Sequence, residues 1–146
     1  IYMSTACVFA GENEKYYTED DVPEPKNYYS KTKLEGEKVV REYENTCIIR
    51  TNFVAKEQWK YPKAFVDRFG TYLFTDNVAQ GIYDVCKKRE KGIVHIVGDK
   101  RMSMYELALL AGSKNVGKMI LDDYEGPNVT VDMSISTKRW KKYKIK

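Results

Sequence analysis

A tyrosine and a lysine four residues apart are the side chains of this sequence best suited to proton transfer. They are Tyr29 and Lys33, in the stretch "YYSKTKLEGE" from Tyr28 to Glu37. Residues at this spacing lie on one face of an α-helix, so a protonated lysine would favour the phenolate form of the tyrosine. Such a tyrosine can give a proton to a carbonyl oxygen or take one from an alcohol. By itself the spacing is weak evidence, because a chance surface pair also produces it.

Hydroxyl and amide side chains in two apolar runs strengthen the argument. Ser4 and Thr5 belong to the run that precedes the tyrosine segment, and Thr51 and Asn52 lie in the run "TCIIRTNFV" that follows it. In open α/β sheets, the groups that contact ligands lie at the carboxyl ends of the strands. We therefore expect these polar groups at one edge of a sheet, near the start of the helix that carries Tyr29.

The apolar runs predict the sheet and the helix that must position these groups. Strands are expected at 1–9, 46–54 and 92–98, because near-continuous apolar runs are typical of strands covered on both faces. A helix is expected from about Tyr29 to Tyr43. Its expected packing positions are Leu34, Val39, Val40 and Tyr43. Strand, helix and strand in this order form a βαβ unit with parallel strands, so the fold class is α/β.

Helix signals recur in the second half of the chain. Asp76 is expected to cap a helix that ends near Gly92. Ser103 and Glu106 have the spacing of a capping box, ahead of a helix that Gly112 ends. A short strand is expected in "NVTVDMSI", beyond residue 118, where helical periodicity fades.

An aromatic segment between residues 57 and 74 predicts a short helix and a loop. Within it, the stretch 58–69 is expected to line the sugar-nucleotide pocket, where its aromatic residues could stack on a base and two basic residues could meet a diphosphate. Core or interface packing and solvated charges are the alternatives, and the sequence favours them for most of these positions. The residues concerned are Trp59, Tyr61, Lys63, Phe65, Arg68 and Phe69.

The composition excludes several classes of protein. With 146 residues, 42% hydrophobic and 32% charged, the chain suits one globular domain and is not disordered. The net charge of +4 is mild. The C-terminus of the chain is basic, but no nucleic-acid-binding motif accompanies it in the sequence. No stretch has the length of a membrane span and no signal peptide is evident. We therefore expect a cytoplasmic protein with no nucleic-acid or membrane partner.

The cysteines and the single histidine are expected in the core. Cys7, Cys47 and Cys86 are widely spaced and lie in apolar runs, which is typical of core residues in a reducing compartment. His95 lies in the apolar run "IVHIVG". We expect neither a disulfide framework nor a metal site.

The motifs together resemble a known family. The stretch "STACVFAGENEKYYTEDDVPEPKNYYSKTKLEGEKVV", followed by "IIRT", is similar to the catalytic half of the extended short-chain dehydrogenases/reductases, in the nucleotide-sugar branch around dTDP-4-dehydrorhamnose reductase. The stretches "FTDNVAQGIYDV", "GIVHIVGDKRMSMYELA" and "VDMSIST" resemble that family more loosely. The resemblance implies the C-terminal portion of such a protein. Residues 1–54 would be part of a Rossmann-like parallel sheet, and 55–146 would add substrate-binding segments and the last strand of the sheet.

The resemblance also implies roles for individual residues. Thr5 would polarise the substrate carbonyl, Tyr29 would be the general acid/base, and Lys33 would hold the nicotinamide ribose. The implied cofactor-binding residues are Ser4, Tyr29, Lys33, Thr51, Asn52 and Phe53. The cofactor would be NADP or NAD. The implied reaction is reduction of a 4-keto group on a nucleotide sugar.

Two departures from the family pattern qualify these expectations. Ala6 and Cys7 replace the Asp-Tyr pair usual after Ser-Thr in the rhamnose reductases, which is closer to nucleotide-sugar epimerases. The glycine-rich loop that cradles the cofactor pyrophosphate is absent, and the chain opens with Ile1 inside an apolar run. We therefore expect an N-terminal half, or another chain, to complete the sheet at its exposed edge. The 146 residues alone should bind NAD(P) weakly or not at all.

Other functions remain open at this point. A nucleotide-sugar epimerase or dehydratase would share the motifs. A non-catalytic regulatory or scaffolding subunit would share the fold, since the regulatory subunit of methionine adenosyltransferase resembles the same reductases. Homo-oligomer formation and the identity of the sugar are also undecided by the sequence.

Overall fold

Three parallel strands form the centre of the molecule in a computed structural model, which describes residues 1–12, 14–57 and 59–146. β1 (Tyr2–Thr5), β2 (Cys47–Thr51) and β7 (Gly92–His95) pair in the order β1-β2-β7, and both pairings are parallel. The predicted α/β class and the parallel strand–helix–strand unit are confirmed.

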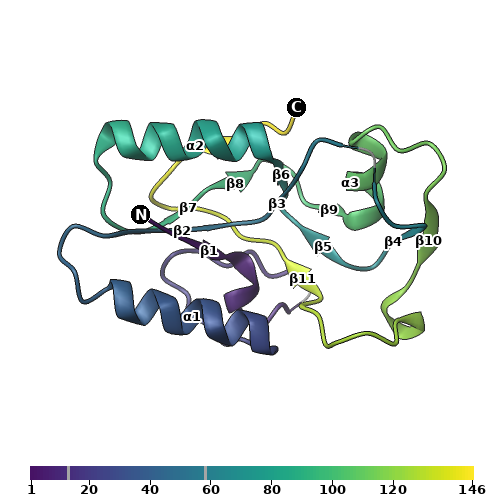
Figure 1. The fold of residues 1–146 in the computed structure, drawn as a ribbon, viewed down its shortest axis with the longest axis horizontal. Helices are drawn as coiled ribbons and strands as arrows, with labels where there is room; N and C mark the ends of the chain where they lie inside the picture. Colours follow the sequence, from purple (N-terminus) through teal and green to yellow (C-terminus); the bar gives the residue numbers. More distant parts are fainter. Residues whose placement is uncertain (13, 58) are drawn as a thin grey trace.

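Two helices lie on opposite sides of these strands (Figure 1). α1 (Tyr28–Val40) faces the side of the sheet that carries Ser4 and Arg50. α2 (Thr75–Lys88) packs with Met3, Ile49 and Val94 on the other side. The order of layers is therefore helix, sheet, helix.

The carboxyl ends of β1 and β2 point toward a second group of short elements (Figure 1). Its strand pairs are parallel for β4 (Lys63–Phe65) with β10 (Gly117–Met119) and for β5 (Phe69–Gly70) with β11 (Asp132–Met133), and antiparallel for β5 with β9 (Met102–Ser103). The helix of this group is α3 (Met104–Leu110), and a 3₁₀ turn, η2, covers Leu121–Asp123. A ligand bound at the carboxyl edge of the sheet would therefore contact this group of elements.

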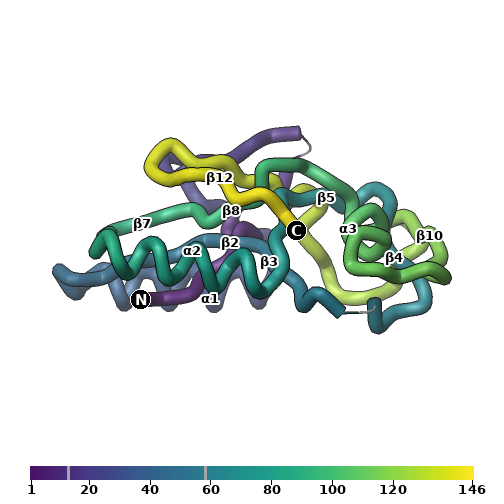
Figure 2. Tube along the Cα trace, turned by 90° about the horizontal axis from the view of Figure 1, so that it is seen from above, coloured from purple at the N-terminus to yellow at the C-terminus, as the bar shows by residue number. Residues whose placement is uncertain are grey.

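Two further parallel pairs complete the fold. β3 (Phe53–Val54) pairs with β6 (Leu73–Phe74), and β8 (Val97–Gly98) pairs with β12 (Lys142–Tyr143). Figure 2 shows the C-terminal segment running beside β8. The basic C-terminus is thus a strand partner of the main body.

The packing face of α1 differs from the expected one. The fully buried side chains of this helix are the polar ones of Ser30 and Glu37, whereas Val39 is 58% exposed and Tyr43 is 69% exposed. The helix ends at Val40, and Tyr43 lies beyond it. The predicted packing roles of Val39 and Tyr43 are therefore wrong, because an ion pair of Glu37 fills the interface instead.

Several predicted boundaries are also corrected. The first strand ends at Thr5, where a 3₁₀ turn, η1 (Ala6–Val8), begins, and the second breaks at Asn52 between β2 and β3. The segment 57–74 forms short strands and no described helix. These strands pair with β10, β11 and β9, which are distant in sequence, so a local pattern could not reveal them.

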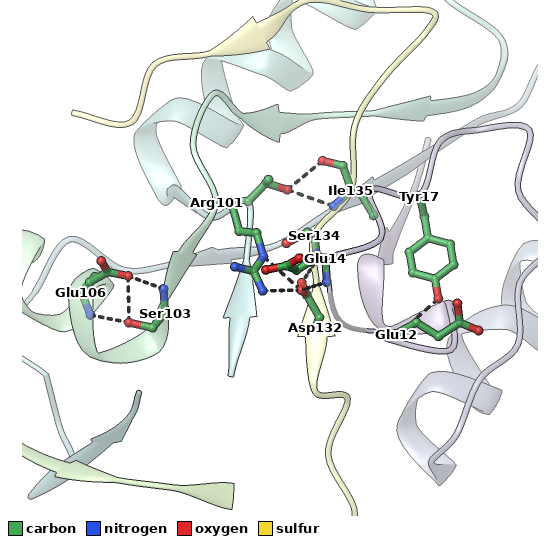
Figure 3. Close-up of polar contacts among 10 residues, drawn as sticks. Glu12, Glu14, Tyr17, Arg101, Ser103, Glu106, Asp132, Ser134 and Ile135 are labelled. Carbon is green, nitrogen blue, oxygen red and sulfur yellow. Dashed lines mark hydrogen bonds and ion pairs between the residues drawn. The ribbon is translucent and has the colours of Figure 1, made fainter. Parts of the chain in front are cut away.

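Helix capping was predicted with mixed success. Ser103 and Glu106 form the expected capping box (Figure 3), and Gly112 follows α3 with a φ of 95°. α2 instead begins after Phe74, whose N–H donates to Asn77 Oδ1 at 3.3 Å. Asp76 lies in the first turn of α2, so its predicted role as the cap is wrong.

The core includes two of the three cysteines and the histidine. Cys7, Cys47 and His95 are buried, as predicted, while Cys86 is exposed, because it lies on the outer side of α2. Within the described residues, no helix is long and apolar enough to cross a membrane.

Candidate active site

Thr5 and Thr51 lie side by side at the carboxyl edge of the sheet. They are register partners at the ends of β1 and β2, and both are buried. The Oγ of Thr5 accepts a hydrogen bond from the N–H of Cys7 at 3.2 Å, which starts the turn η1. Among the described residues no group accepts the hydroxyl proton of Thr5, so this proton is available for an acceptor on a ligand.

Tyr29 and Lys33 lie one turn apart on α1, as the spacing predicts. Tyr29 is in the first turn and is 56% exposed, and within the described residues its hydroxyl makes no hydrogen bond. The start of α1 lies near η1, against which the helix packs (Figure 1). The N-terminal end of α1 therefore shares the carboxyl edge of the sheet with Thr5.

The start of α1 is fixed by a side-chain cap. Asn27 Oδ1 accepts hydrogen bonds from the backbone N–H of Ser30 at 2.9 Å and from its hydroxyl at 2.8 Å. Capping by Asn satisfies backbone donors that have no partner within the helix. The cap defines where the helix begins, and so the position of Tyr29 in its first turn.

A buried ion pair fixes the middle of α1 against the sheet. Arg50 of β2 donates from Nε to Glu37 Oε1 at 2.9 Å and from Nη2 to Glu37 Oε2 at 2.7 Å. Ser4 of β1 donates its hydroxyl proton to the same carboxylate. Burial alone would raise the pKa of Glu37, but hydrogen bonds and charge from Arg50, with help from Ser4, bring it below its ordinary value.

This pair was missed by the sequence reasoning. Both residues stand in the quoted motifs, Glu37 in "KLEGE" and Arg50 in "IIRT". A single arginine inside an otherwise apolar strand was the available signal, since a buried charge requires a partner. The carboxylate on the facing helix is that partner.

The predicted cofactor-binding residues differ in whether their side chains already have a hydrogen-bond partner in the protein. Ser4 is bonded to Glu37, and Asn52 donates from Nδ2 to the carbonyl of Met133 at 2.7 Å. The Thr51 hydroxyl is buried with no partner among the described residues, and Phe53 is 49% exposed. The cofactor contacts of these residues stay predictions.

An ion pair on the far side of the edge holds β11 in place (Figure 3). Asp132 accepts hydrogen bonds from Arg101 Nη2 at 2.8 Å and from the N–H of Ser134 at 2.8 Å. Burial would raise the pKa of Asp132, and hydrogen bonding by Ser134, Arg101 and the N–H of Glu14 more than offsets this, so the pKa is lowered. The pair orients the segment whose Met133 carbonyl receives Asn52.

Most of the predicted aromatic segment lines an open groove of about 480 Å³ in the second group of elements. The residues of the prediction that line it are Trp59, Tyr61, Lys63, Phe65 and Arg68. Arg68 donates from Nε to the carbonyl of Thr130 at 2.9 Å. Phe69 lies instead beneath the guanidinium of Arg101, and the Arg101 Cζ is 3.8 Å from the centroid of the Phe69 ring. Binding of a base or a diphosphate in this groove stays a prediction.

The sequence also matches a family of known proteins. Residues 1–71 match the family model described as the RmlD substrate binding domain. This part includes Thr5, Tyr29, Lys33 and Thr51. The resemblance to dTDP-4-dehydrorhamnose reductases stated from the sequence is confirmed.

Individual relatives and solved structures agree on the fold. The chain is 34% identical over 134 residues to methionine adenosyltransferase 2 subunit beta of Rattus norvegicus, covering 74% of this chain and 39% of that protein. The crystal structure of dTDP-4-dehydrorhamnose reductase from Yersinia enterocolitica superposes with a TM-score of 0.79 at 24% identity, covering 94% of this chain and 57% of that one. The Bacillus anthracis reductase in complex with NADP gives a TM-score of 0.78 at 22% identity, covering 92% and 55%. The chain thus spans about two fifths of the length of the rat relative and just over half of the two reductases.

Proposed function

We propose that this chain belongs to a dTDP-4-dehydrorhamnose reductase-like, NAD(P)-dependent oxidoreductase that reduces a 4-keto group on a nucleotide sugar. The chain would supply the residues that transfer the proton. The observation that carries the proposal is the placement of Thr5. Its hydroxyl is buried at the carboxyl end of β1, its oxygen accepts from the Cys7 N–H, and among the described residues no group accepts its proton. The start of the Tyr29 helix lies at the same edge.

Reduction of the ketone turns its oxygen into an alkoxide, and this oxygen requires a proton donor. Thr5 would hydrogen-bond the ketone oxygen and polarise the carbonyl group. Tyr29 would give its proton to that oxygen as negative charge develops there. Lys33, one turn further along α1, would hold the nicotinamide ribose.

A nicotinamide cofactor would supply the hydride to the carbonyl carbon. Two features of the edge suit such a group. The buried Thr51 hydroxyl has no partner among the described residues, and Phe53, two residues further along the chain, is half-exposed and apolar. Thr51, Phe53 and Lys33 are therefore the residues we propose to hold the nicotinamide end. Ser4 and Asn52 already bond to protein groups, so they would support the site from behind.

Replacing Tyr29 by phenylalanine tests this function. In the full-length protein, Tyr29→Phe should lower the rate of NADPH-dependent reduction of a 4-keto nucleotide sugar by about 10² to 10⁴, the range for loss of a general acid. Tyr28→Phe is the matched control, because the neighbouring Tyr28 is 84% exposed and has no proposed role. An enzyme that turns over normally with Tyr29→Phe would contradict the proposal.

A second candidate is a non-catalytic regulatory subunit. It is favoured by the 34% identity to a protein named as a subunit of methionine adenosyltransferase. For such a subunit, wild type and Tyr29→Phe would both show no turnover of any nucleotide sugar, and both would bind a protein partner with the same affinity. Affinity measured by calorimetry for the two proteins, beside the turnover assay, separates the two functions.

An epimerase or dehydratase would keep the same residues but use them differently. The Ala6-Cys7 departure after Thr5 is the reason to test for it. A reductase oxidises one NADPH for each sugar that it converts. An epimerase regenerates its cofactor in each cycle, so sugar would be converted without net consumption of NADPH.

A further inference from the structure

Tyr2 lies beneath the middle of α1, where it contacts two parts of Lys33. The hydroxyl of Tyr2 donates to the Lys33 carbonyl at 3.2 Å. The Lys33 ammonium nitrogen lies 4.7 Å from the centroid of the Tyr2 ring. An ammonium over an aromatic face is attracted by the electrons of the ring. One side chain of β1 thus holds both the backbone and the charged end of the same lysine.

Gly36 makes room for this arrangement. A Cβ at position 36 would lie 2.1 Å from the Tyr2 hydroxyl oxygen and 2.6 Å from Cζ of the ring. Glycine inside a helix costs stability relative to alanine, because it loses more conformational freedom. The glycine in "KLEGE" therefore has a local explanation, which is the close approach of Tyr2 to the helix.

We propose that Tyr2 is the positioning residue for Lys33, and that its ring holds the lysine ammonium on the side of α1 that faces the sheet. A lysine side chain has many rotamers, and a ring beneath it restricts them. Within the described residues, the ammonium of Lys33 has no hydrogen bond or ion pair. Among the described residues, the face of the Tyr2 ring is therefore the group that attracts this ammonium.

The consequence for catalysis rests on the proposed function. If Lys33 holds the nicotinamide ribose, a lysine already fixed over Tyr2 binds the cofactor at a smaller loss of conformational entropy. Loss of the ring should then weaken cofactor binding more than it slows the chemical step. The carbonyl contact of Tyr2 matters less, because α1 is fixed independently by Glu37 and Arg50.

The position of the ammonium can be measured without any activity. In full-length protein whose lysines carry ¹³C-methyl groups, which keep the charge, NMR should show the Lys33 methyl signal moved upfield by the ring current of Tyr2. Lys33→Arg identifies the signal by removing it. Tyr2→Leu should move it to the position of an exposed lysine, and Tyr2→Phe should leave it upfield. The signal of the exposed Lys31 is the internal control. A Lys33 signal that is the same in wild type and Tyr2→Leu overturns the proposal.

A cycle of two substitutions tests the contact with Gly36 in the same protein. Gly36→Ala should lower the melting temperature when Tyr2 is present, because of the clash. Combined with Tyr2→Leu, it should lower the melting temperature less, or raise it, because alanine favours the helix. Equal effects of Gly36→Ala in both backgrounds would contradict the close packing on which the proposal depends.

Kinetics then separate this inference from the proposed function. Tyr2→Leu should raise the KM for NADPH by about threefold to tenfold with kcat nearly unchanged, as expected for lost uniform binding, and Tyr2→Phe should restore the wild-type KM. An unchanged KM in Tyr2→Leu would refute the role of Tyr2 in cofactor binding. A wild-type protein without NADPH-dependent turnover would refute the proposed function, while the NMR signal would still decide whether Tyr2 positions Lys33.

Discussion

Arg50 and Glu37 join a strand to the helix that carries Tyr29 through two parallel hydrogen bonds, of 2.9 and 2.7 Å. Both side chains are fully buried, and the Arg50 guanidinium also lies 5.0 Å from the centroid of the Phe9 ring. A two-point contact sets the angle as well as the distance between helix and sheet. The position of α1 on the sheet, and with it that of Tyr29 and Lys33, therefore depends on a residue pair that takes no part in the proposed reaction.

Glu37→Gln should destabilise the protein by about 3 kcal/mol, because it leaves the buried Arg50 charge uncompensated. The free energy of unfolding from urea titration measures this loss. Glu35→Gln is the control on the same helix, since Glu35 is exposed and its ion pair with Lys38 should contribute less than about 1 kcal/mol. Similar losses of unfolding free energy in the two variants would show that the buried ion pair contributes no more stability than the exposed one.

The single histidine should make stability depend on pH below neutrality. Burial lowers the pKa of His95, although the carboxylate of Glu19 opposes this. In the unfolded chain the histidine has a pKa of about 6.5, so as the pH falls the unfolded state takes up the proton first. His95 therefore contributes stability above about pH 6.5, and this is lost as the pH falls toward its lower folded pKa, at no more than about 1.4 kcal/mol per pH unit.

Comparison with His95→Gln isolates this effect. The free energy of unfolding of wild type should fall as the pH drops below about 6.5, while that of the variant should change little. The pKa values of Glu37 and Asp132 are lowered, so their stabilising contributions are lost only at more acidic pH. If the unfolding free energies of the two proteins changed with pH in parallel, protonation of His95 would not destabilise the folded state, and the prediction would be wrong.

Thr5→Val should reveal two roles of one hydroxyl. It removes the acceptor for the Cys7 N–H, which costs about 1 to 3 kcal/mol for a buried donor left without a partner, and it removes the proposed hydrogen bond to the ketone. Thr5→Ser keeps both. We expect kcat/KM to fall by about 10² in the valine variant and to recover in the serine variant. Recovery of stability without recovery of kcat/KM would separate the structural role from the catalytic one.

Asp132→Asn should destabilise the second group of elements by about 2 kcal/mol, because Arg101 loses a buried charged partner. Hydrogen exchange followed by mass spectrometry should show increased exchange in the residues around β11 and little change in α1. Asp20→Asn is a suitable control, because the ion pair of Asp20 with Lys138 is exposed. Equal protection of β11 in Asp132→Asn and wild type would contradict the importance of the pair.

The sequence predicted the elements that depend on local patterns. Near-continuous apolar runs predicted the parallel strands around Ile49 and Val94, and the Ser103–Glu106 spacing predicted a capping box, because both signals are complete within a few residues. The same holds for the placement of Tyr29 and Lys33 on one helix. For the candidate site, the register of β1 and β2 brings Thr5 beside Thr51, as the parallel arrangement required.

The tertiary structure decided what packs against what. An apolar pattern on α1 suggested Val39 and Tyr43 as buried, yet the helix is anchored by Glu37, because its partner Arg50 lies on a neighbouring strand. The pairing of β4 with β10 joins segments far apart in the chain, which no local signal encodes. Charge compensation and strand pairing are relations between distant residues, so they become visible only when the chain is folded.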